Sequence, residues 1–432
     1  MQAGKFGCMN GVLVFSSLFI IYIFLIVKSG KSFPILYLFL FTYFLQYIFS
    51  VYLIYNEYDQ LKIFMPISQE AYFGYASYAL FFLFLGVFAF NRDIDLDRLV
   101  KEINVRKATT LGYLLVFISY FLDLIDYLGF SGSIGSILSF TSYLKYVGAF
   151  CFLFSNSKMA YLFSGLIYFQ LLVIVVRDSV FIDFFIWSTY LFFFVVLKFQ
   201  IPFWLRATFI LLAAPILITV QSVKKEYRQA TWSNREEANL ETFSDFAAED
   251  FQEISSQNYG QSGGVVSTVG RLSQGWHLAM TLRWVPTYQS LVNGEEILSD
   301  ITSSLLPRII INDKKTVGTQ EKFKKYTGYK LRGATSMTIG VLGDFYINFG
   351  VMGSFIMLFV FGAVIARLLY FFIKTFVLKD PIYIVWIPFM FSYLIRANND
   401  FYMVFNCLVK GFLIFLFVDF IIKRIWKRMN LA

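Results

Sequence analysis

The chain has little charge and few residues of the kinds that hold metals or form disulfides. Of its 432 residues, 15% are charged, three are cysteines and one is a histidine. Cys8, Cys151 and Cys407 are widely separated, and the last two lie in apolar segments. We therefore expect neither a disulfide framework nor a metal cluster, and the single histidine leaves no second one for a zinc site.

Motifs for nucleotide and hydrolase chemistry are also missing. There is no P-loop, no metal-ligand spacing and no nucleophile elbow. We expect no cofactor. The net charge of +9 would favour nucleic acid in a soluble protein, but here most basic residues sit at the ends of hydrophobic segments, so no nucleic-acid partner is expected.

Hydrophobic residues dominate what is present. They make up 58% of the chain, with 21% aromatic residues and a mean hydropathy of +0.64, far outside soluble globular usage. A helix that crosses a bilayer needs about 20 apolar residues. Windows of that kind occur near 11–27, 34–55, 71–90, 109–128, 137–155, 159–176, 180–197, 204–221, 351–373, 382–397 and 403–422. The composition thus predicts an all-α polytopic membrane protein with about eleven transmembrane helices.

The distribution of Lys and Arg predicts the orientation of these helices. If the helices alternate in direction, the basic turns and the basic tail all fall on one side, which is then the cytoplasmic side. These residues are Lys28, Lys31, Arg92, Arg98, Lys101, Arg106, Lys107, Lys198, Arg206, Lys374, Lys379, Lys423, Arg424, Lys427 and Arg428. The first segment has no small-residue cleavage pattern, so we interpret it as a spanning helix rather than a signal peptide.

Three regions follow from this topology. Residues 1–221 form transmembrane helices one to eight, and residues 222–336 form one large periplasmic or extracytoplasmic loop with short helices. Residues 337–432 form a re-entrant segment or polar helix entrance followed by the last three transmembrane helices. A loop of this length in a compact protein is usually functional or disordered.

Charge divides the loop into two halves. From 224 to 253 there are eight acidic and four basic residues, whereas from 271 to 332 there are ten basic and five acidic residues. The basic half predicts an anionic ligand. Arginine holds phosphate oxygens with a planar fork, so we rank the arginines above lysines such as Lys322. The arginines are Arg271, Arg283, Arg308 and Arg332. The alternative is that each merely solvates the loop or pairs with a carboxylate.

His277 is the candidate proton acceptor. A helix through this stretch would place Arg271, Gln274 and His277 on one face. Histidine titrates near neutrality, which suits it to exchange a proton with a sugar hydroxyl. The alternative is an ordinary interfacial histidine beside Trp276.

A polar, glycine-rich stretch leads into the next apolar segment. If it is helical, Asp344 and Asn348 share one face four residues apart, with Tyr346 between them. An ionisable residue at that depth is costly and is by default a candidate site residue facing an interior cavity. The alternative is a buried polar contact between helices, with Gly350 and neighbouring glycines allowing close packing.

Other charged residues lie near the predicted outer turns. Arg396 and Asp400 are spaced to pair on a helix, and we favour this structural role. Asp123 and Asp126 lie at the outer end of one helix. Arg177, on a very short turn beside Asp178, is close enough in the topology to reach the cavity under the large loop.

Chemistry on the outer face has no access to cytoplasmic nucleotides. A transfer reaction there needs a donor that is already activated and carried by a lipid. A polyprenyl pyrophosphate meets that need, and its departing charge would require the arginines.

The motif residues resemble the O-antigen and capsule repeat-unit polymerases (Wzy). The resemblance rests on Arg271-Leu-Ser-Gln-Gly-Trp-His277, Val285-Pro286, Leu306-Pro307-Arg308 with Lys314, and the run from Gly343 through Asp344, Tyr346 and Asn348 to Gly353. These motifs cover about 271 to 353, and the rest of the chain agrees in hydropathy layout. Asp344 stands where relatives often have Glu, and Lys315 stands where relatives often have Pro.

The resemblance implies a membrane glycosyltransferase of the C class (GT-C) that joins oligosaccharide units carried on undecaprenyl pyrophosphate. It implies a bacterial inner-membrane location, an active site facing the periplasm, and a flippase and a chain-length regulator as further partners. Carried over to this sequence, Arg271, Arg308 and Lys314 would bind pyrophosphate. His277 and Asp344 are the catalytic candidates. The remaining binding candidates are Arg283, Arg332, Gln274, Tyr346, Asn348, Arg177 and Arg396.

Two other functions remain open from the sequence. An O-antigen ligase would share the fold class, the donor and the outer loop. A flippase for lipid-linked oligosaccharide would usually show repeated helical halves and short loops, and neither is seen here.

Overall fold

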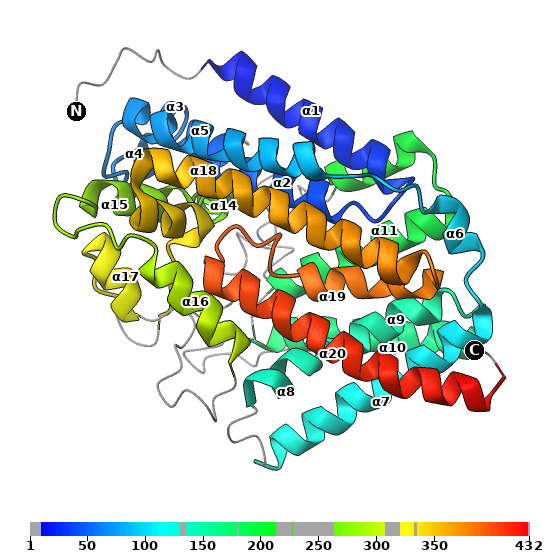
Figure 1. The fold of residues 1–432 in the computed structure, drawn as a ribbon. Helices are drawn as coiled ribbons and strands as arrows, with labels where there is room; N and C mark the ends of the chain where they lie inside the picture. The colour runs from blue at the N-terminus through cyan, green and yellow to red at the C-terminus, as the bar shows by residue number, and fades with distance from the viewer. Residues whose placement is uncertain are drawn as a thin grey trace.

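The computed structural model describes residues 10–129, 135–178, 181–212, 227, 263–306, 320–331 and 335–430. Within these ranges the chain is helical and contains no strand. Figure 1 shows the long helices side by side in a bundle, with the N-terminal and C-terminal helices both on its outside. A helix satisfies its own backbone hydrogen bonds, and for this reason apolar segments of this length are helical in lipid.

The N-terminal half of the chain supplies most of the bundle. Several helices begin at a side-chain cap: Asn10 accepts from Val12 N at 3.0 Å, and Ser68 accepts from Ala71 N at 3.3 Å. The elements are α1 (Gly11–Ser29), α2 (Ile35–Phe44), a π turn (Leu45–Phe49), α3 (Ser50–Asn56), α4 (Asp59–Lys62), α5 (Gln69–Phe90), α6 (Asp97–Lys101), α7 (Val105–Tyr127), α8 (Gly135–Thr141), α9 (Leu144–Leu153), α10 (Lys158–Asp178) and α11 (Ile182–Phe199).

The C-terminal half contains the remaining helices. Those from α14 to α17, which we call the loop helices, lie in the predicted large loop. They are α14 (Gly263–Leu272), α15 (Gly275–Trp284), α16 (Glu295–Leu305) and α17 (Gln320–Thr327). They precede α18 (Gly340–Phe372), a π turn (Ile373–Val377), a 3-10 turn (Pro381–Trp386), α19 (Ile387–Phe391) and α20 (Phe401–Arg428).

Eight helices among the described residues are long and apolar enough to cross a membrane. They span Gly11–Ser29, Ile35–Asn56, Gln69–Phe90, Val105–Tyr127, Lys158–Asp178, Ile182–Phe199, Gly340–Val377 and Phe401–Arg428. Shorter apolar helices occupy the other three predicted windows at Ile137–Leu153, Phe203–Leu212 and Pro381–Phe391. The chain is therefore a polytopic helical membrane protein, while the total of eleven crossings stays a prediction.

Helices α5 and α18 pack closely against each other. A Cβ on Gly86 would lie 2.1 Å from the carbonyl oxygen of Phe359, and one on Gly362 would lie 2.4 Å from that of Leu83. Each glycine thus lets the backbone of one helix touch the other, the arrangement expected for helices that associate in lipid. This contact fixes the position of α18, which carries Asp344.

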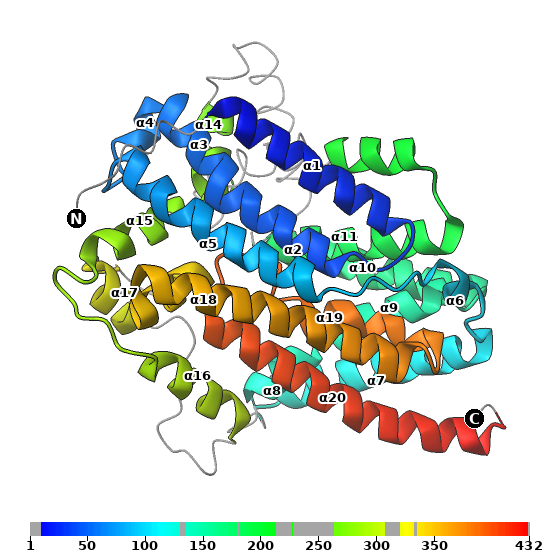
Figure 2. The ribbon, with the colours of Figure 1, turned by 45° about the horizontal axis from the view of Figure 1, so that its top comes forward.

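The basic turns gather at one end of the bundle, as predicted from the alternation of the helices. Lys28 pairs with Asp93, and Lys107 pairs with Asp380 at 2.7 Å. The guanidinium of Arg206 donates to the carbonyl of Ile26 at 2.8 Å. We call this the basic end; the loop helices lie at the opposite end in both views (Figures 1 and 2).

Helix α18 begins eleven residues before the predicted apolar window and contains a kink. Its residues run in one helix from Gly340, except that Gly350 has φ 65° and ψ −167°. This backbone conformation is accessible essentially only to glycine. The segment predicted as a re-entrant stretch or polar entrance is thus helical, and the kink at Gly350 separates it from the rest of α18.

Candidate functional site

The two motif segments that are distant in the sequence meet between α15 and α18. The hydroxyl of Tyr346 donates to the carbonyl of Val285 at 2.8 Å, and the backbone N of Val292 donates to the carbonyl of Ile347 at 3.0 Å. The backbone N of Ile297 donates to the side-chain oxygen of Asn348 at 3.4 Å. The first turns of α18 are thereby hydrogen-bonded to the end of α15, to the segment after it and to α16.

His277 lies on α15, and its side chain contacts that of Gln274, the N-cap residue of this helix. Its Nδ1 is 2.9 Å from Oε1 of Gln274, and its ring packs edge-on against Trp276 and Phe323. This contact occupies Nδ1 of His277 and leaves Nε2 outside it. Burial lowers the pKa of His277 to about 4. The imidazole is therefore neutral at pH 7 and has the form of a general base.

Arg271 does not share a helix face with His277, contrary to expectation. Helix α14 ends at Leu272 and α15 starts at Gly275, so the predicted single helix is interrupted. The interruption has a clear cause, because the backbone N of Gln274 donates to the carbonyl of Gln46 at 3.0 Å instead of to its own helix. Arg271 is exposed at the end of α14.

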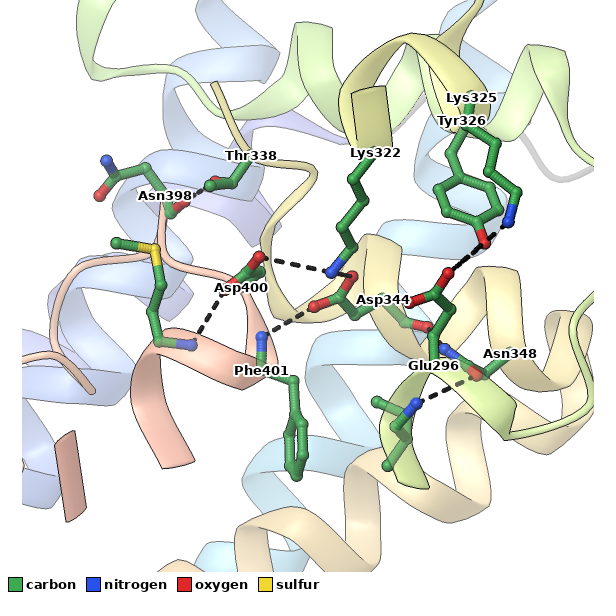
Figure 3. A network of polar contacts seen from close by, with 12 residues as sticks. Glu296, Lys322, Lys325, Tyr326, Thr338, Asp344, Asn348, Asn398, Asp400 and Phe401 are labelled. Carbon is green, nitrogen blue, oxygen red and sulfur yellow. Dashed lines mark hydrogen bonds and ion pairs between the residues drawn. The ribbon is translucent and has the colours of Figure 1, made fainter. Parts of the chain in front are cut away.

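A buried ion cluster lies where α17, α18 and α20 meet (Figure 3). The Nζ of Lys322 is 2.8 Å from Oδ1 of Asp344 and 3.3 Å from Oδ2 of Asp400. Asp344 is 1% exposed and Asp400 is 2% exposed. A lone charge would not be stable in such a place, so the ammonium and the carboxylates depend on one another. We call Lys322, Asp344 and Asp400 the ion cluster.

Backbone N–H groups donate further hydrogen bonds to both carboxylates. The other oxygen of Asp344 accepts from the backbone N of Phe401 at 2.8 Å. Asp400 is the N-cap of α20, and its Oδ1 accepts from the backbone N of Met403 at 3.0 Å. The two carboxylates thus tie the first turn of α20 to the first turns of α18.

The electrostatics of Lys322 show which effect dominates in the cluster. Burial alone would lower the pKa of its ammonium, but Asp344, Asp400 and the nearby Asp300 outweigh burial and raise that pKa above its usual value. Lys322 is therefore charged at any physiological pH.

A second set of contacts joins α16 to α17. The hydroxyl of Tyr326 donates to Oε1 of Glu296 at 2.8 Å, and Nζ of Lys325 lies 3.6 Å from the same oxygen. Figure 3 shows these residues beside the ion cluster, with Asn348 close to Glu296. The loop helices α16 and α17 are consequently joined to each other as well as to α18 and α20.

Sequence reasoning missed the roles of Lys322 and Asp400. The sequence ranks Lys322 below the arginines because a lysine is a flexible point charge, yet Lys322 lies four residues before Tyr326 on the buried face of α17. Asp400 was expected to pair with Arg396. The signal that could have identified it is its place immediately before a long apolar helix, where an aspartate is a favoured N-cap.

Arg396 has a different partner from the one expected. Residues 392–400 form turns rather than a helix, so the spacing of four residues does not bring Arg396 and Asp400 together. The guanidinium of Arg396 pairs with Asp183 on α11 and lies over the ring of Tyr393, 5.0 Å from its centre. The hydroxyl of Tyr143 donates to the same carboxylate at 3.4 Å. Arg396 therefore belongs to a separate polar contact that joins the turns after α19 to α11 and to the turn between α8 and α9.

The other predicted basic residues fall into two groups. Arg177 pairs with its neighbour Asp178 at 2.8 Å on the surface, and Arg283 is exposed on α15. Arg308, Lys314 and Arg332 lie outside the described residues.

The arrangement offers a neutral base and a set of fixed charges at one end of the bundle. Helix α15 packs on α17 through His277 and Phe323, whose ring centres are 5.7 Å apart, and Phe323 follows Lys322 in the chain. Within the described ranges no group of three or more His, Cys, Asp or Glu residues is placed to hold a metal ion. The described residues thus place a neutral imidazole on the helix that packs beside the helix of Lys322.

Comparisons of the chain with protein-family models, with curated proteins and with solved structures find no match.

Proposed function

We propose that this chain is a membrane glycosyltransferase that polymerises oligosaccharide repeat units carried on undecaprenyl pyrophosphate into a surface polysaccharide, either O antigen or capsule. One observation carries the proposal. The two segments that resemble repeat-unit polymerases, around His277 and around Asp344, pack together through Tyr346 and Val285. Residues that act on one substrate must be close in space, and this contact brings the two segments together despite their distance in the sequence.

The proposal includes an orientation. The basic end lies in the cytoplasm of a bacterial inner membrane, in keeping with the excess of Lys and Arg there. The loop helices then face the periplasm. A lipid-linked donor brings its own activation to that face, so the reaction needs no nucleotide.

The chemical step would use His277 as the base. The acceptor sugar hydroxyl gives its proton to Nε2 of His277, and the hydroxyl oxygen forms a bond to the anomeric carbon of the donor chain. The bond between that carbon and the pyrophosphate oxygen breaks. The oxygen keeps the electron pair, and the pyrophosphate leaves still attached to its lipid. Basic residues that bind the leaving group stabilise its growing charge.

Arg271, Arg308 and Lys314 are the proposed ligands of the pyrophosphate. Arg271 is suited to this because it is exposed at the end of α14, next in the chain to the turn that holds Gln274. Lys322 is not suited to it because two carboxylates already hold its ammonium. Its proposed role is to keep Asp344 and the first turns of α18 in position under the site.

Deletion of the gene tests the class of reaction. Surface lipid should then carry a single repeat unit, because units are still made and exported but are no longer joined. If deletion removes every unit, including the single one, the polymerase proposal is wrong and a ligase or flippase replaces it.

Purified enzyme with lipid-linked units, assayed in the presence of a chelator, tests the residues. Arg271→Ala should abolish long chains, and His277→Gln should reduce their yield, while both proteins keep their expression level. Lys324→Ala is the matched control, since Lys324 is an exposed residue of α17. An unchanged ladder for Arg271→Ala would remove that arginine from the site.

A further inference from the structure

Helix α16 buries three polar residues beside Ile297 and exposes two leucines. Asp300 is 1% exposed, and Ser303 and Ser304 are buried with it. On the opposite face, Leu298 is 64% exposed and Leu305 is 56% exposed. A surface helix of a soluble protein has the reverse arrangement, because its apolar stripe faces the core.

This reversed arrangement is the one expected for a helix that faces lipid. Where the surroundings are hydrocarbon, ionisable side chains turn to the protein interior. The outer face also carries Glu295, in the first turn of the helix, and Thr302. The hydroxyl of Thr302 donates to backbone carbonyls of its own helix, at 3.1 Å for Leu298 and 3.0 Å for Ser299. Such internal bonds remove the need for a solvent partner.

The position of α16 supports the same conclusion. It packs against α20, and both views show it beside the N-terminal turns of that helix (Figures 1 and 2). Helix α20 is a candidate membrane span from Phe401 to Arg428. Its large exposed apolar residues are Leu413, Leu416, Phe417 and Phe420. The outward leucines of α16 thus lie on a helix that packs directly against a candidate membrane span whose own exposed apolar residues begin at Leu413.

We propose that α16 is embedded at the edge of the bilayer, with Leu298 and Leu305 against lipid hydrocarbon and with Asp300, Ser303 and Ser304 facing the ion cluster. The helix then separates lipid from the ion cluster by a single helix diameter, about 10 Å. This inference concerns a contact surface for lipid, and it holds whether or not the chain is a polymerase. It also revises the expectation that residues 222–336 form one polar loop outside the membrane.

Spin labels in reconstituted vesicles test this inference. Leu298→Cys and Leu305→Cys are made in a chain whose cysteines are removed by Cys8→Ser, Cys151→Ala and Cys407→Ala, and the labelled proteins are placed in vesicles of phosphatidylethanolamine and phosphatidylglycerol. Collision with oxygen, which concentrates in hydrocarbon, is compared with collision with a water-soluble nickel chelate. Phe417→Cys is the lipid-facing control and Lys324→Cys is the water-facing control.

Labels at Leu298→Cys and Leu305→Cys should behave like the label at Phe417→Cys, with oxygen favoured over nickel. Values like those of Lys324→Cys would overturn the inference, since they would place this face in water. Protection from both reagents would overturn it as well, because another protein segment would then cover the face. As a second measurement, Leu305→Asp should lower the yield of inserted protein, whereas Lys324→Asp should not.

Discussion

Lys322 on α17 lies 2.8 Å from Asp344 on α18, and this ion pair fastens a loop helix to the entrance of a membrane helix. Both side chains are mostly shielded, with 18% of the lysine and 1% of the aspartate side chain exposed. Asp400 at the start of α20 shares the same ammonium. Three segments of the chain therefore depend on one cation for their mutual position.

Removing the cation should destabilise the protein strongly. Lys322→Met leaves two buried carboxylates without their ammonium, and the loss of one partner of a buried pair costs about 3 to 5 kcal/mol. The midpoint of thermal unfolding in detergent should fall well below that of the parent protein. Lys324→Met, on the exposed face of the same helix, should leave it nearly unchanged. Equal midpoints for the two variants would contradict a role for the ion cluster in stability.

His277 should make stability depend on pH in one direction. Its pKa is about 4 in the folded protein, below its ordinary value of 6.5. The unfolded chain therefore binds the proton first, and stability that is complete above pH 6.5 is lost as the pH falls towards 4. Full protonation of His277 should lower the free energy of unfolding by about 3 kcal/mol.

The control for this pH dependence is simple because His277 is the one histidine of the chain. Unfolding midpoints are measured at pH 7.5 and pH 5 for the parent protein and for His277→Gln. The parent should lose more stability between the two values than the variant. A loss of the same size in both would assign the effect to carboxylates and not to the imidazole.

Gly350 should resist replacement by any residue with a side chain. Its φ of 65° and ψ of −167° are strained for such residues, so Gly350→Ala should cost about 1 to 3 kcal/mol or straighten α18. Gly165→Ala on α10 is the matched control, because a Cβ there meets nothing within 4 Å. The measurement is the unfolding midpoint together with the proposed transferase activity. A Gly350→Ala protein as stable and active as Gly165→Ala would show that the kink is dispensable.

The ion pair between Arg396 and Asp183 should matter more than the pair between Arg177 and Asp178. The first is largely shielded, with 14% of the arginine and 27% of the aspartate side chain exposed, whereas the second is on the surface with 64% and 46% exposed. Asp183→Asn should lower the unfolding midpoint clearly, and Asp178→Asn should change stability by less than about 1 kcal/mol. The reverse order would contradict these assignments.

Much of the membrane architecture could be predicted because hydropathy is a local property. Each of the eleven apolar windows contains an apolar helix, although eight of these among the described residues are long enough to span. The basic end follows from the same alternation. By contrast, the break between α14 and α15 depends on a hydrogen bond to Gln46, which lies far away in the sequence and leaves no local signal.

The candidate site was predictable in part for the same reason. The segments around His277 and Asp344 stand out in the sequence, because a lone histidine and an aspartate beside an apolar helix are unusual. Their packing against each other through Tyr346 and Val285 is a tertiary contact, and spacing along the chain says nothing about it.

The sequence by itself determined that the chain forms apolar helices in a membrane, which end carries the basic turns, and where polar residues enter the apolar segments. Only the tertiary structure decided that Lys322 pairs with Asp344 and Asp400, that Arg396 pairs with Asp183, and that α16 exposes two leucines. Hydropathy and charge are calculated from consecutive residues, so they can be obtained from the sequence without the fold. An ion pair or a buried face depends on which distant segments lie within a few ångströms, and this is set by the packing of the whole bundle.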